Sequence, residues 1–330
     1  MTQSRILCSV LLAAASLSLT ACAGGHSGEQ YIFISTNVKV PYWQTAAAGF
    51  SQSGAELKVA YQFTGPDTYD PAGEREALDR AIQSKPAGIL ISVADANILK
   101  DGIDRAIGAG IPVITADSDA PASKRLFFIG TNNYQAGVAG GKRLVQELKG
   151  HGNVVVFTMP SQPNLNERLH GYKDAMESSP QIKLSHIVDV KGDPRVAFDT
   201  TTEFLANDKK EHVDAFVCLE AISGKEVATV LNNNSIKGRV VIAMDTDPET
   251  LGWIRKGVIA ATIAQKPYTM AFVGLKMLDT LHHQNLPNLD SDWSHNGFSP
   301  VPAFVDTGSS VVDKANLESF ESAAKSLTGK

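Results

Sequence analysis

Polar and aromatic side chains that suit a polyhydroxylated ligand recur in this 330-residue chain, mostly just after short apolar segments. They combine carboxylates, amides, hydroxyls, one guanidinium and two aromatic rings, and the candidate ligand contacts are Asn37, Tyr42, Trp43, Ser92, Asp117, Ser118, Asn133, Arg168, Glu220, Asp245 and Gln265. Carboxylates and amides exchange hydrogen bonds with vicinal hydroxyl groups, and aromatic rings stack on the C–H face of a sugar. The set favours a site for a sugar or related polyol; the alternative for any single Asp or Asn is a helix cap.

The apolar segments that precede these residues have the length and composition of buried strands, and helix-length amphipathic segments separate them. Strands are expected at 31–35, 58–63, 88–92, 112–116 and 126–129, and again at 153–158, 184–188, 215–219, 240–244 and 259–264. Helices are expected near 43–54, 72–84, 98–108, 165–178, 196–207, 224–232, 248–256 and 268–283, with a further strand at 303–305. Near-continuous Val, Ile and Leu strands are typical of parallel sheets with crossover helices.

Two such rounds predict an α/β fold of two doubly wound parallel-sheet domains, with the chain crossing between them more than once. Ligands of open parallel sheets bind outside the carboxyl ends of the strands. We therefore expect the candidate side chains of both domains to face one shared cleft.

The first 22 residues indicate export. Arg5 and an apolar run over 6–19 precede Leu19-Thr20-Ala21-Cys22, a layout typical of a secretory signal and too short for a lasting membrane span. The tetrapeptide resembles the bacterial lipobox, which implies a signal peptide over 1–21, acylation of Cys22 and a glycine-rich tether over 22–30. The alternative is an ordinary cleaved signal with an incidental cysteine. We expect a lipid-anchored protein on the periplasmic side of the cell envelope.

Composition excludes several functional classes. A net charge of −5 without a cluster of Lys and Arg argues against a nucleic-acid partner. Cys218 is the one cysteine beyond Cys22, so no intrachain disulfide is expected, and its apolar neighbours predict a core thiol. Gly224-Lys225 lacks the rest of a phosphate loop, and Asp245 with Asp247 lacks the spacing of a calcium loop. We expect no enzyme activity, no cofactor and no metal site.

The chain resembles the ribose-type branch of the periplasmic sugar-binding proteins, which have the type I periplasmic-binding fold, over about residues 31–313. Residues 35–37 with 41–43, 88–92, 111–117, 167–168 with 171–172, 244–245 with 248, and 260–265 carry the resemblance. It implies that Tyr42 and Trp43 clamp a sugar ring. It also implies that four further side chains bind the ring oxygen and hydroxyls, namely Asp117, Arg168, Asp245 and Gln265, with a charge-assisted link between Asp117 and Arg168 across the cleft.

Three places depart from the family pattern, and one of them is Lys39-Val40, where the family has an asparagine before the aromatic pair. Ser118 stands where the family has an arginine, and Glu220 stands where ribose binders have an asparagine. The added carboxylate and the lost positive charge favour a ligand other than ribose, with a different hydroxyl pattern or an amino group.

The resemblance also implies the domain organisation. We expect one lobe from 31–132 plus 266–304 and the other from 133–265 plus 305–330, with a hinge of three crossings near 132–133, 265–266 and 305–308.

The function implied is that of a monomeric substrate-binding lipoprotein of an ABC importer. It would bind a monosaccharide or polyol in the cleft, close by hinge motion and present the ligand to a membrane permease. The alternative is a sensor that presents a sugar or autoinducer-2 to a chemoreceptor or kinase.

Overall fold

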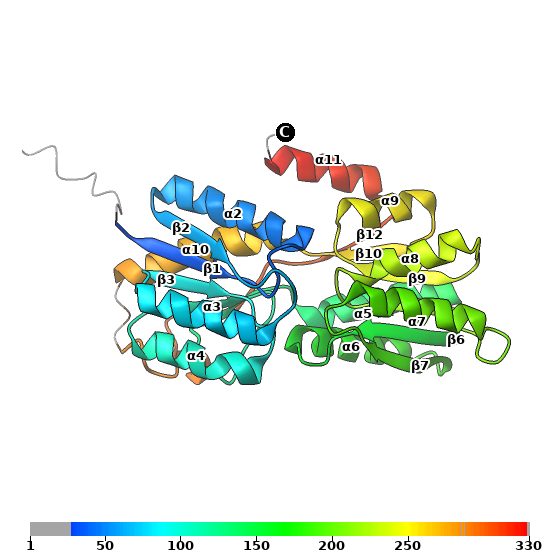
Figure 1. Cartoon of the computed structure of the whole chain (residues 1–330), viewed down its shortest axis with the longest axis horizontal. Coiled ribbons are helices and arrows are strands. Elements are labelled where there is room, and N and C mark those ends of the chain that lie inside the picture. The colour runs from blue at the N-terminus through cyan, green and yellow to red at the C-terminus, as the bar shows by residue number, and fades with distance from the viewer. Residues whose placement is uncertain (1–27, 285, 287, 329–330) are drawn as a thin grey trace, which may run out of the picture.

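The computed structural model describes residues 28–284, 286 and 288–328, which form two α/β lobes, each built around its own six-stranded sheet (Figure 1). The expected signal peptide and the acylation of Cys22 lie outside the described residues. Within those residues, no helix combines the length and the apolar character that a bilayer crossing requires.

The sheet of the first lobe is parallel throughout, in the order β11-β5-β4-β3-β1-β2. Its strands are β1 (Gln30–Ile34), β2 (Ala60–Thr64), β3 (Gly88–Ile91), β4 (Val113–Ala116), β5 (Phe128–Gly130) and β11 (Phe304–Asp306). Its helices are α2 (Pro41–Leu57), α3 (Pro71–Ser84), α4 (Ala96–Gly108) and α10 (Pro267–Gln284). Helices α2 and α10 pack together, as do α3 and α4, so the sheet is covered on both faces.

The second lobe repeats this winding in the order β12-β10-β9-β8-β6-β7. Its strands are β6 (His151–Thr158), β7 (Gln181–Asp189), β8 (Ala215–Cys218), β9 (Val240–Met244), β10 (Ala261–Ala264) and β12 (Ser310–Asp313). Its helices are α5 (Asn133–Leu148), α6 (Pro163–Met176), α7 (Pro194–Ala206), α8 (Ser223–Asn233), α9 (Pro248–Lys256) and α11 (Leu317–Thr328). The prediction of two doubly wound domains is confirmed, but β12 runs antiparallel to β10, so the second sheet is not parallel throughout.

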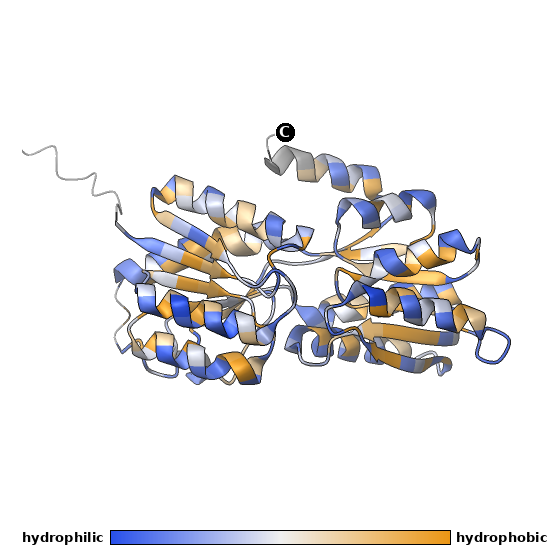
Figure 2. Cartoon of the chain, viewed as in Figure 1, coloured by the Kyte–Doolittle hydropathy of each residue, from blue (hydrophilic) through white to orange (hydrophobic). Residues whose placement is uncertain are grey.

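The central strands are buried on both faces, as their composition predicts. All residues of β3, β4, β8 and β10 are buried, whereas the edge strand β2 is largely exposed. The apolar residues concentrate in the strands and on the inward sides of the helices (Figure 2). Cys218 lies in this core as a free thiol, as predicted. Burial of apolar area at about 25 cal/mol per Å² stabilises each lobe.

The chain passes between the lobes three times: from β5 to α5, from β10 to α10, and from β11 to β12. The predicted lobe boundary at residue 304 is wrong by two residues. Strand β11 pairs with β5 through Asp306, so Val305 belongs to the first sheet and the last crossing spans 307–309. Before β11, Leu286 and Trp293 of the Pro- and Asn-rich segment pack against the core of the first lobe.

Candidate ligand-binding site

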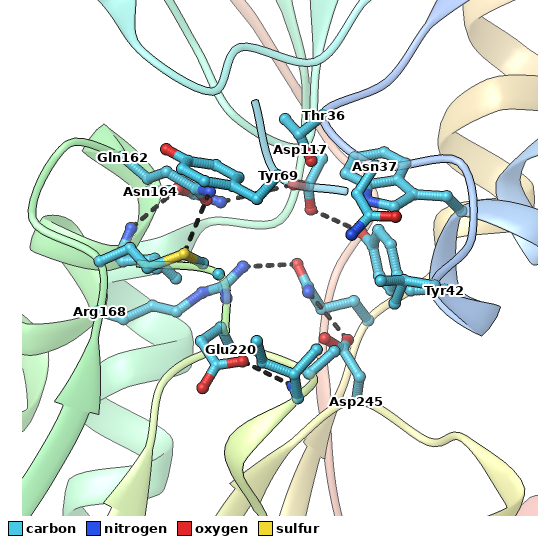
Figure 3. Close-up of a pocket in the computed structure, with 18 residues that line it drawn as sticks. Thr36, Asn37, Tyr42, Tyr69, Asp117, Gln162, Asn164, Arg168, Glu220 and Asp245 are labelled. Carbon is cyan, nitrogen blue, oxygen red and sulfur yellow. Dashed lines mark hydrogen bonds between the residues drawn. The ribbon is translucent and has the colours of Figure 1, made fainter. Parts of the chain in front are cut away.

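A cavity of about 70 Å³ lies between the lobes, where the carboxyl ends of the strands of both sheets meet (Figure 3). The first lobe contributes Thr36, Asn37, Val40, Tyr42, Trp43, Tyr69 and Asp117 to its lining. The second lobe contributes Met159, Gln162, Asn164, Leu165, Arg168, Gly192, Glu220, Ala221, Ile222 and Asp245, and Gln265 lies at the middle crossing. The volume exceeds that of several water molecules, and this edge of an open α/β sheet is where ligands bind.

Arg168, on α6, lines this cavity, and hydrogen bonds to other protein groups hold its side chain in place. Its side chain donates from Nε to Oδ1 of Asn133 (2.9 Å), from Nη1 to the carbonyl oxygen of Leu219 (2.7 Å) and from Nη2 to Oε1 of Gln265 (2.9 Å). The residue is only 3 % exposed. A guanidinium has five N–H groups, so these bonds hold the group in place and leave two for a ligand.

Close packing of α5 against α6 determines where Arg168 lies. A Cβ atom at Gly137 of α5 would lie 2.1 Å from the carbonyl oxygen of Arg168, and one at Gly171 of α6 would lie 2.2 Å from that of Tyr134. Gly140 and Gly141 also face α6, where a Cβ atom would lie 2.1 Å from the hydroxyl of Tyr172 and 2.6 Å from Cβ of Ala175, respectively. Because these glycines have no side chains, α6 can lie close to α5, and Arg168 reaches Gln265 at the middle crossing.

Gln265 connects the guanidinium to a carboxyl group. Its Oε1 accepts from Arg168 while its Nε2 donates to Oδ1 of Asp245 (2.9 Å). The polar chain Arg168–Gln265–Asp245 therefore has fixed donor and acceptor directions before any ligand arrives.

Asp117 and Asp245 occupy equivalent places, each directly after the fourth strand of its lobe. Both have left-handed backbone conformations, with φ of 65° and 68°. Such φ values are uncommon for residues other than glycine, and Asp tolerates them better than most. Conformational strain of this kind concentrates at functional sites, and here it turns one carboxyl group from each lobe toward the cavity.

Burial dominates the electrostatics of the carboxyl groups. It raises the pKa of Asp245 to about 7, against the opposing effects of Arg168 and the Gln265 hydrogen bond, while the charges of Asp117 and Glu220 add to the rise. Burial also raises the pKa of Asp117, partly offset by the charge of Arg168 and the hydrogen bond from Tyr42. Asp245 is thus partly protonated near neutral pH, and it can donate or accept a hydrogen bond.

Tyr42 and Trp43 form one wall of the cavity at the start of α2. Their rings are perpendicular (88°), with centroids 4.9 Å apart. The hydroxyl of Tyr42 donates to Oδ1 of Asp117 (2.6 Å), and burial raises its pKa well above the usual value, so it stays a donor at neutral pH. The pair offers apolar ring surface beside the polar chain.

The two lobes touch beside the cavity. Tyr69, in the loop after β2, donates its hydroxyl to the carbonyl oxygen of Ala94 (2.8 Å) and lies 2.9 Å from Oγ of Ser161 in the second lobe. A Cβ atom at Gly192 would lie 2.4 Å from Cβ of Tyr69. On the opposite lobe, Asn164 reaches Oδ2 of Asp117 at 3.5 Å.

The structure brings most of the predicted site residues together. Asn37, Tyr42, Trp43, Asp117, Arg168, Glu220, Asp245 and Gln265 line the cavity, whereas Ser92, Ser118 and Asn133 do not. Ser92 and Ser118 are fully buried, and their hydroxyls have no hydrogen-bond partner in the part of the chain that the structure describes. Asn133 does not reach the cavity but orients Arg168 by accepting a hydrogen bond from its Nε.

Two predicted interactions take another form. Oε2 of Glu220 accepts from the backbone N–H of Ile222 (2.6 Å), and its Oε1 accepts from the backbone N–H and the hydroxyl of Ser223. The carboxylate therefore holds its own loop at the start of α8. Within the described residues, no hydrogen bond or ion pair joins Asp117 to Arg168; their interaction is through charge alone.

The sequence-based selection missed several lining residues, chiefly Tyr69, Gln162 and Asn164. Tyr69 follows β2 at the same sheet edge as the other candidates, so the rule that selected them also applies to it. Gln162 and Asn164 lie at the N-terminus of α6, one to two turns before Arg168.

One group of potential metal ligands lies away from the cavity, at the far end of the first lobe. Nε2 of His283 lies 3.0 Å from Oε1 of Glu29, its Nδ1 lies 2.7 Å from the carbonyl oxygen of Asp279, and Asp279 accepts from Tyr31. These contacts join the start of β1 to the end of α10.

Two lobes of this winding, joined by three crossings around a buried polar cavity, define a two-lobe binding protein with the type I periplasmic-binding fold. The sequence matches the family described as "Periplasmic binding protein domain" over residues 31–284, and the chain belongs to that family.

Named relatives and solved structures agree with this assignment. The xylose/arabinose-binding protein of Sulfolobus acidocaldarius is 23 % identical over 89 % of this chain and 73 % of its own length. The structure of an arabinose-binding protein from Geobacillus stearothermophilus is 32 % identical, with a TM-score of 0.73 over 88 % of this chain and 99 % of that one. A solute-binding protein from Burkholderia graminis, solved in complex with D-arabinose, is 27 % identical, with a TM-score of 0.80 over 89 % and 98 %.

Proposed function

We propose that this protein is the substrate-binding component of an ABC importer and binds a pentose or hexose in the cavity between its lobes. The observation that carries the proposal is the chain Arg168–Gln265–Asp245 beside the rings of Tyr42 and Trp43. Fixed donors and acceptors next to an aromatic face match a ring with hydroxyls on its rim and C–H groups on its face. The sugars named for the relatives support the same ligand class.

Binding would couple to closure because the contacts come from both lobes. Asp117 and Tyr42 belong to the first lobe, Arg168 and Asp245 to the second, and Gln265 to a crossing between them. A ligand that bonds to both sides binds the closed arrangement better than an open one and so shifts the population toward it. The three crossings serve as the hinge, and the closed shape is the form offered to the permease. Micromolar affinity corresponds to about 8 kcal/mol.

The location proposed is the outer side of a membrane, with acylated Cys22 as the anchor. The residues between Cys22 and the first strand have the glycine-rich, polar composition that is typical of linkers. The proposal is supported by the lipobox-like tetrapeptide.

A thermal-shift screen of the mature protein against pentoses and hexoses tests the ligand class. A sugar at a hundredfold excess over its dissociation constant adds about 2.7 kcal/mol to stability. The bound sugar should also change the fluorescence of Trp43, and Asp245→Ala should abolish this change while the protein stays folded.

Asp101→Ala, which removes an exposed carboxylate of α4, is the matched control and should bind as the wild type does. Full affinity in Asp245→Ala would exclude Asp245 from the site, and the absence of any stabilising sugar would refute the ligand class. Loss of uptake of that sugar in a deletion strain would separate import from sensing.

A further inference from the structure

A second, larger cavity adjoins the first. Its volume is about 550 Å³, and it shares with the first cavity the residues Val40, Tyr42, Ala221, Asp245 and Gln265. The two spaces are therefore neighbours, with the side chains of Tyr42, Asp245 and Gln265 between them. A ligand in the first cavity whose substituent lies on this side would place that substituent in the second cavity.

Both lobes and the C-terminal helix enclose this second cavity. The starts of α2 and α10 form one wall, the starts of α8 and α9 form another, and α11 lies above the junction beside α9 (Figure 1). Its lining residues outside the shared set are Pro41, Thr45, Lys225, Thr246, Asp247, Pro248, Lys266, Pro267, Tyr268, Thr269, Ser310, Phe320, Ala323 and Ala324. The space is thus part of the interlobe cleft, and lobe motion would open and close it together with the first cavity.

The lining is mostly apolar with a few hydroxyls. Pro41, Pro248, Pro267, Tyr268 and Phe320 present ring and methylene surface, which suits a flat ring with apolar faces.

The charges of the second cavity disfavour a cationic occupant. Lys225 and Lys266 supply two ammonium groups, and Nζ of Lys225 lies 3.9 Å from Glu249. The carboxylate of Asp247 is already occupied as the cap of α9, because it accepts from the backbone N–H groups of Glu249 and Thr250 and from the hydroxyl of Thr250. The other lining carboxyl group is that of Asp245, whose burial raises its pKa to about 7, so it is partly protonated near neutral pH. A neutral or anionic group fits this balance.

The boundary suits an ether oxygen. Such an oxygen accepts hydrogen bonds but cannot donate them, so it needs a donor beside it. Nε2 of Gln265 has two N–H groups, and Asp245 accepts one of them. The second N–H group of Nε2 can donate to an ether oxygen, and Gln265 lines both cavities.

On the basis of the proposed sugar-binding function, we propose that the ligand is a glycoside, with one sugar ring in the first cavity and a neutral or anionic second ring, joined through the anomeric oxygen, in the second. The single-ring sugar would be a weaker ligand that leaves the second cavity to water.

Calorimetry on the mature protein tests this with defined probes. The sugar that binds most tightly among D-xylose, L-arabinose, D-ribose, D-allose and D-tagatose is compared with its methyl and 4-nitrophenyl glycosides, both anomers of each. For one anomer, the aryl glycoside should bind at least about tenfold more tightly than the methyl glycoside, because an aromatic ring becomes buried.

Filling the second cavity should remove this advantage. Ala324→Trp from α11 and Thr269→Trp from α10 approach the space from different walls, so one can fail to fold without loss of the test. In a folded variant the aryl and methyl glycosides should bind within about twofold of each other, while the affinity for the free sugar stays unchanged. Ser322→Trp, at an exposed position of α11 that does not line the cavity, should behave as the wild type.

Each outcome decides between the two proposals. Equal binding of aryl and methyl glycosides by the wild type, or an aryl advantage that survives both filling substitutions, overturns the glycoside proposal and leaves the sugar site intact. If none of the free sugars and none of the glycosides binds, the proposed function itself fails, and this inference fails with it.

Discussion

At the scale of single residues, the same local arrangement, an aspartate directly after the fourth strand, occurs once in each lobe. Asp117 and Asp245 each follow a fourth strand in a left-handed conformation, and their carboxyl groups face each other's lobes across the same cavity. One guanidinium, that of Arg168, serves both carboxyl groups through its charge. Two buried carboxyl groups therefore share one positive charge, and the effect of this imbalance on the free energy of unfolding can be measured.

Asp245→Asn should change how stability depends on pH. The pKa of Asp245 rises from 3.8 in the unfolded chain to about 7 in the folded one. Between these values the unfolded carboxyl group is ionised while the folded one keeps its proton, so the free energy of unfolding falls as pH rises from about 4 to about 7. Asparagine does not titrate, so the variant should gain stability relative to the wild type as pH rises over this range, by about 1.4 kcal/mol per pH unit.

Urea unfolding of both proteins at several pH values across this range, without ligand, measures the difference. Parallel curves would show that Asp245 is ionised in the folded protein throughout. Asp117 and Glu220 also have raised pKa values, and their charges act on Asp245, so the difference between the two proteins measures the titration of Asp245 together with its coupling to these groups.

At this scale, the direction of each side chain could not be predicted from the sequence. The position of a residue after a strand predicted that Asp117 and Ser118 both face the ligand, but neighbouring residues point to opposite sides, and only Asp117 lines the cavity. Glu220 was selected for its position directly after a strand, and in the structure its carboxylate accepts hydrogen bonds from its own loop. The residue types were predictable, whereas their hydrogen-bond partners required the folded chain.

At the scale of elements, the contact between α5 and α6 positions the site. Gly137→Ala should lower stability by about 1–3 kcal/mol, because the added methyl group meets the backbone oxygen of Arg168 and the helices must separate. The shift should also weaken ligand binding, since it moves the guanidinium. Chemical denaturation and calorimetry measure the two effects.

Gly252→Ala provides the control for that substitution. Gly252 lies within α9, and a Cβ atom there would meet nothing within 4 Å. Alanine should be neutral or stabilise the helix by up to about 1 kcal/mol, without an effect on binding. A similar loss in both variants would mean that the α5–α6 contact has no special role.

Most elements were predictable from the alternation of strand-like and helix-like segments, and their ends follow local chemistry. Strand β2 begins at Ala60 and not at 58, because Lys58 takes a left-handed conformation that ends α2. Strand β12 and helix α11 were not predicted. A four-residue edge strand, Ser-Val-Val-Asp, has too short a pattern to recognise, and its antiparallel direction depends on where the last crossing leads.

At the scale of the whole molecule, the contact between lobes sets the balance between open and closed forms. Tyr69→Phe removes the hydroxyl that lies 2.9 Å from Ser161, so the closed form loses one hydrogen bond. Ligand affinity should fall by about twofold to tenfold, which corresponds to the typical net value of 0.5–1.5 kcal/mol.

Ser161→Ala removes the same bond from the other lobe, and a double-mutant cycle tests whether the two changes are one effect. The double variant should bind about as tightly as either single variant, because the second substitution has nothing left to remove. Fully additive losses of affinity, measured by calorimetry, would show that the two hydroxyls act independently.

The three crossings also have a consequence for biosynthesis. Strand β11, which completes the first sheet beside β5, is translated after nearly all of the second lobe, and β12, which completes the second sheet beside β10, follows it directly. A nascent or prematurely terminated chain that stops before residue 304 leaves β5 and β10 as uncovered apolar edges, which readily pair with other chains. Newly made protein therefore needs protection from aggregation until its last thirty or so residues are available.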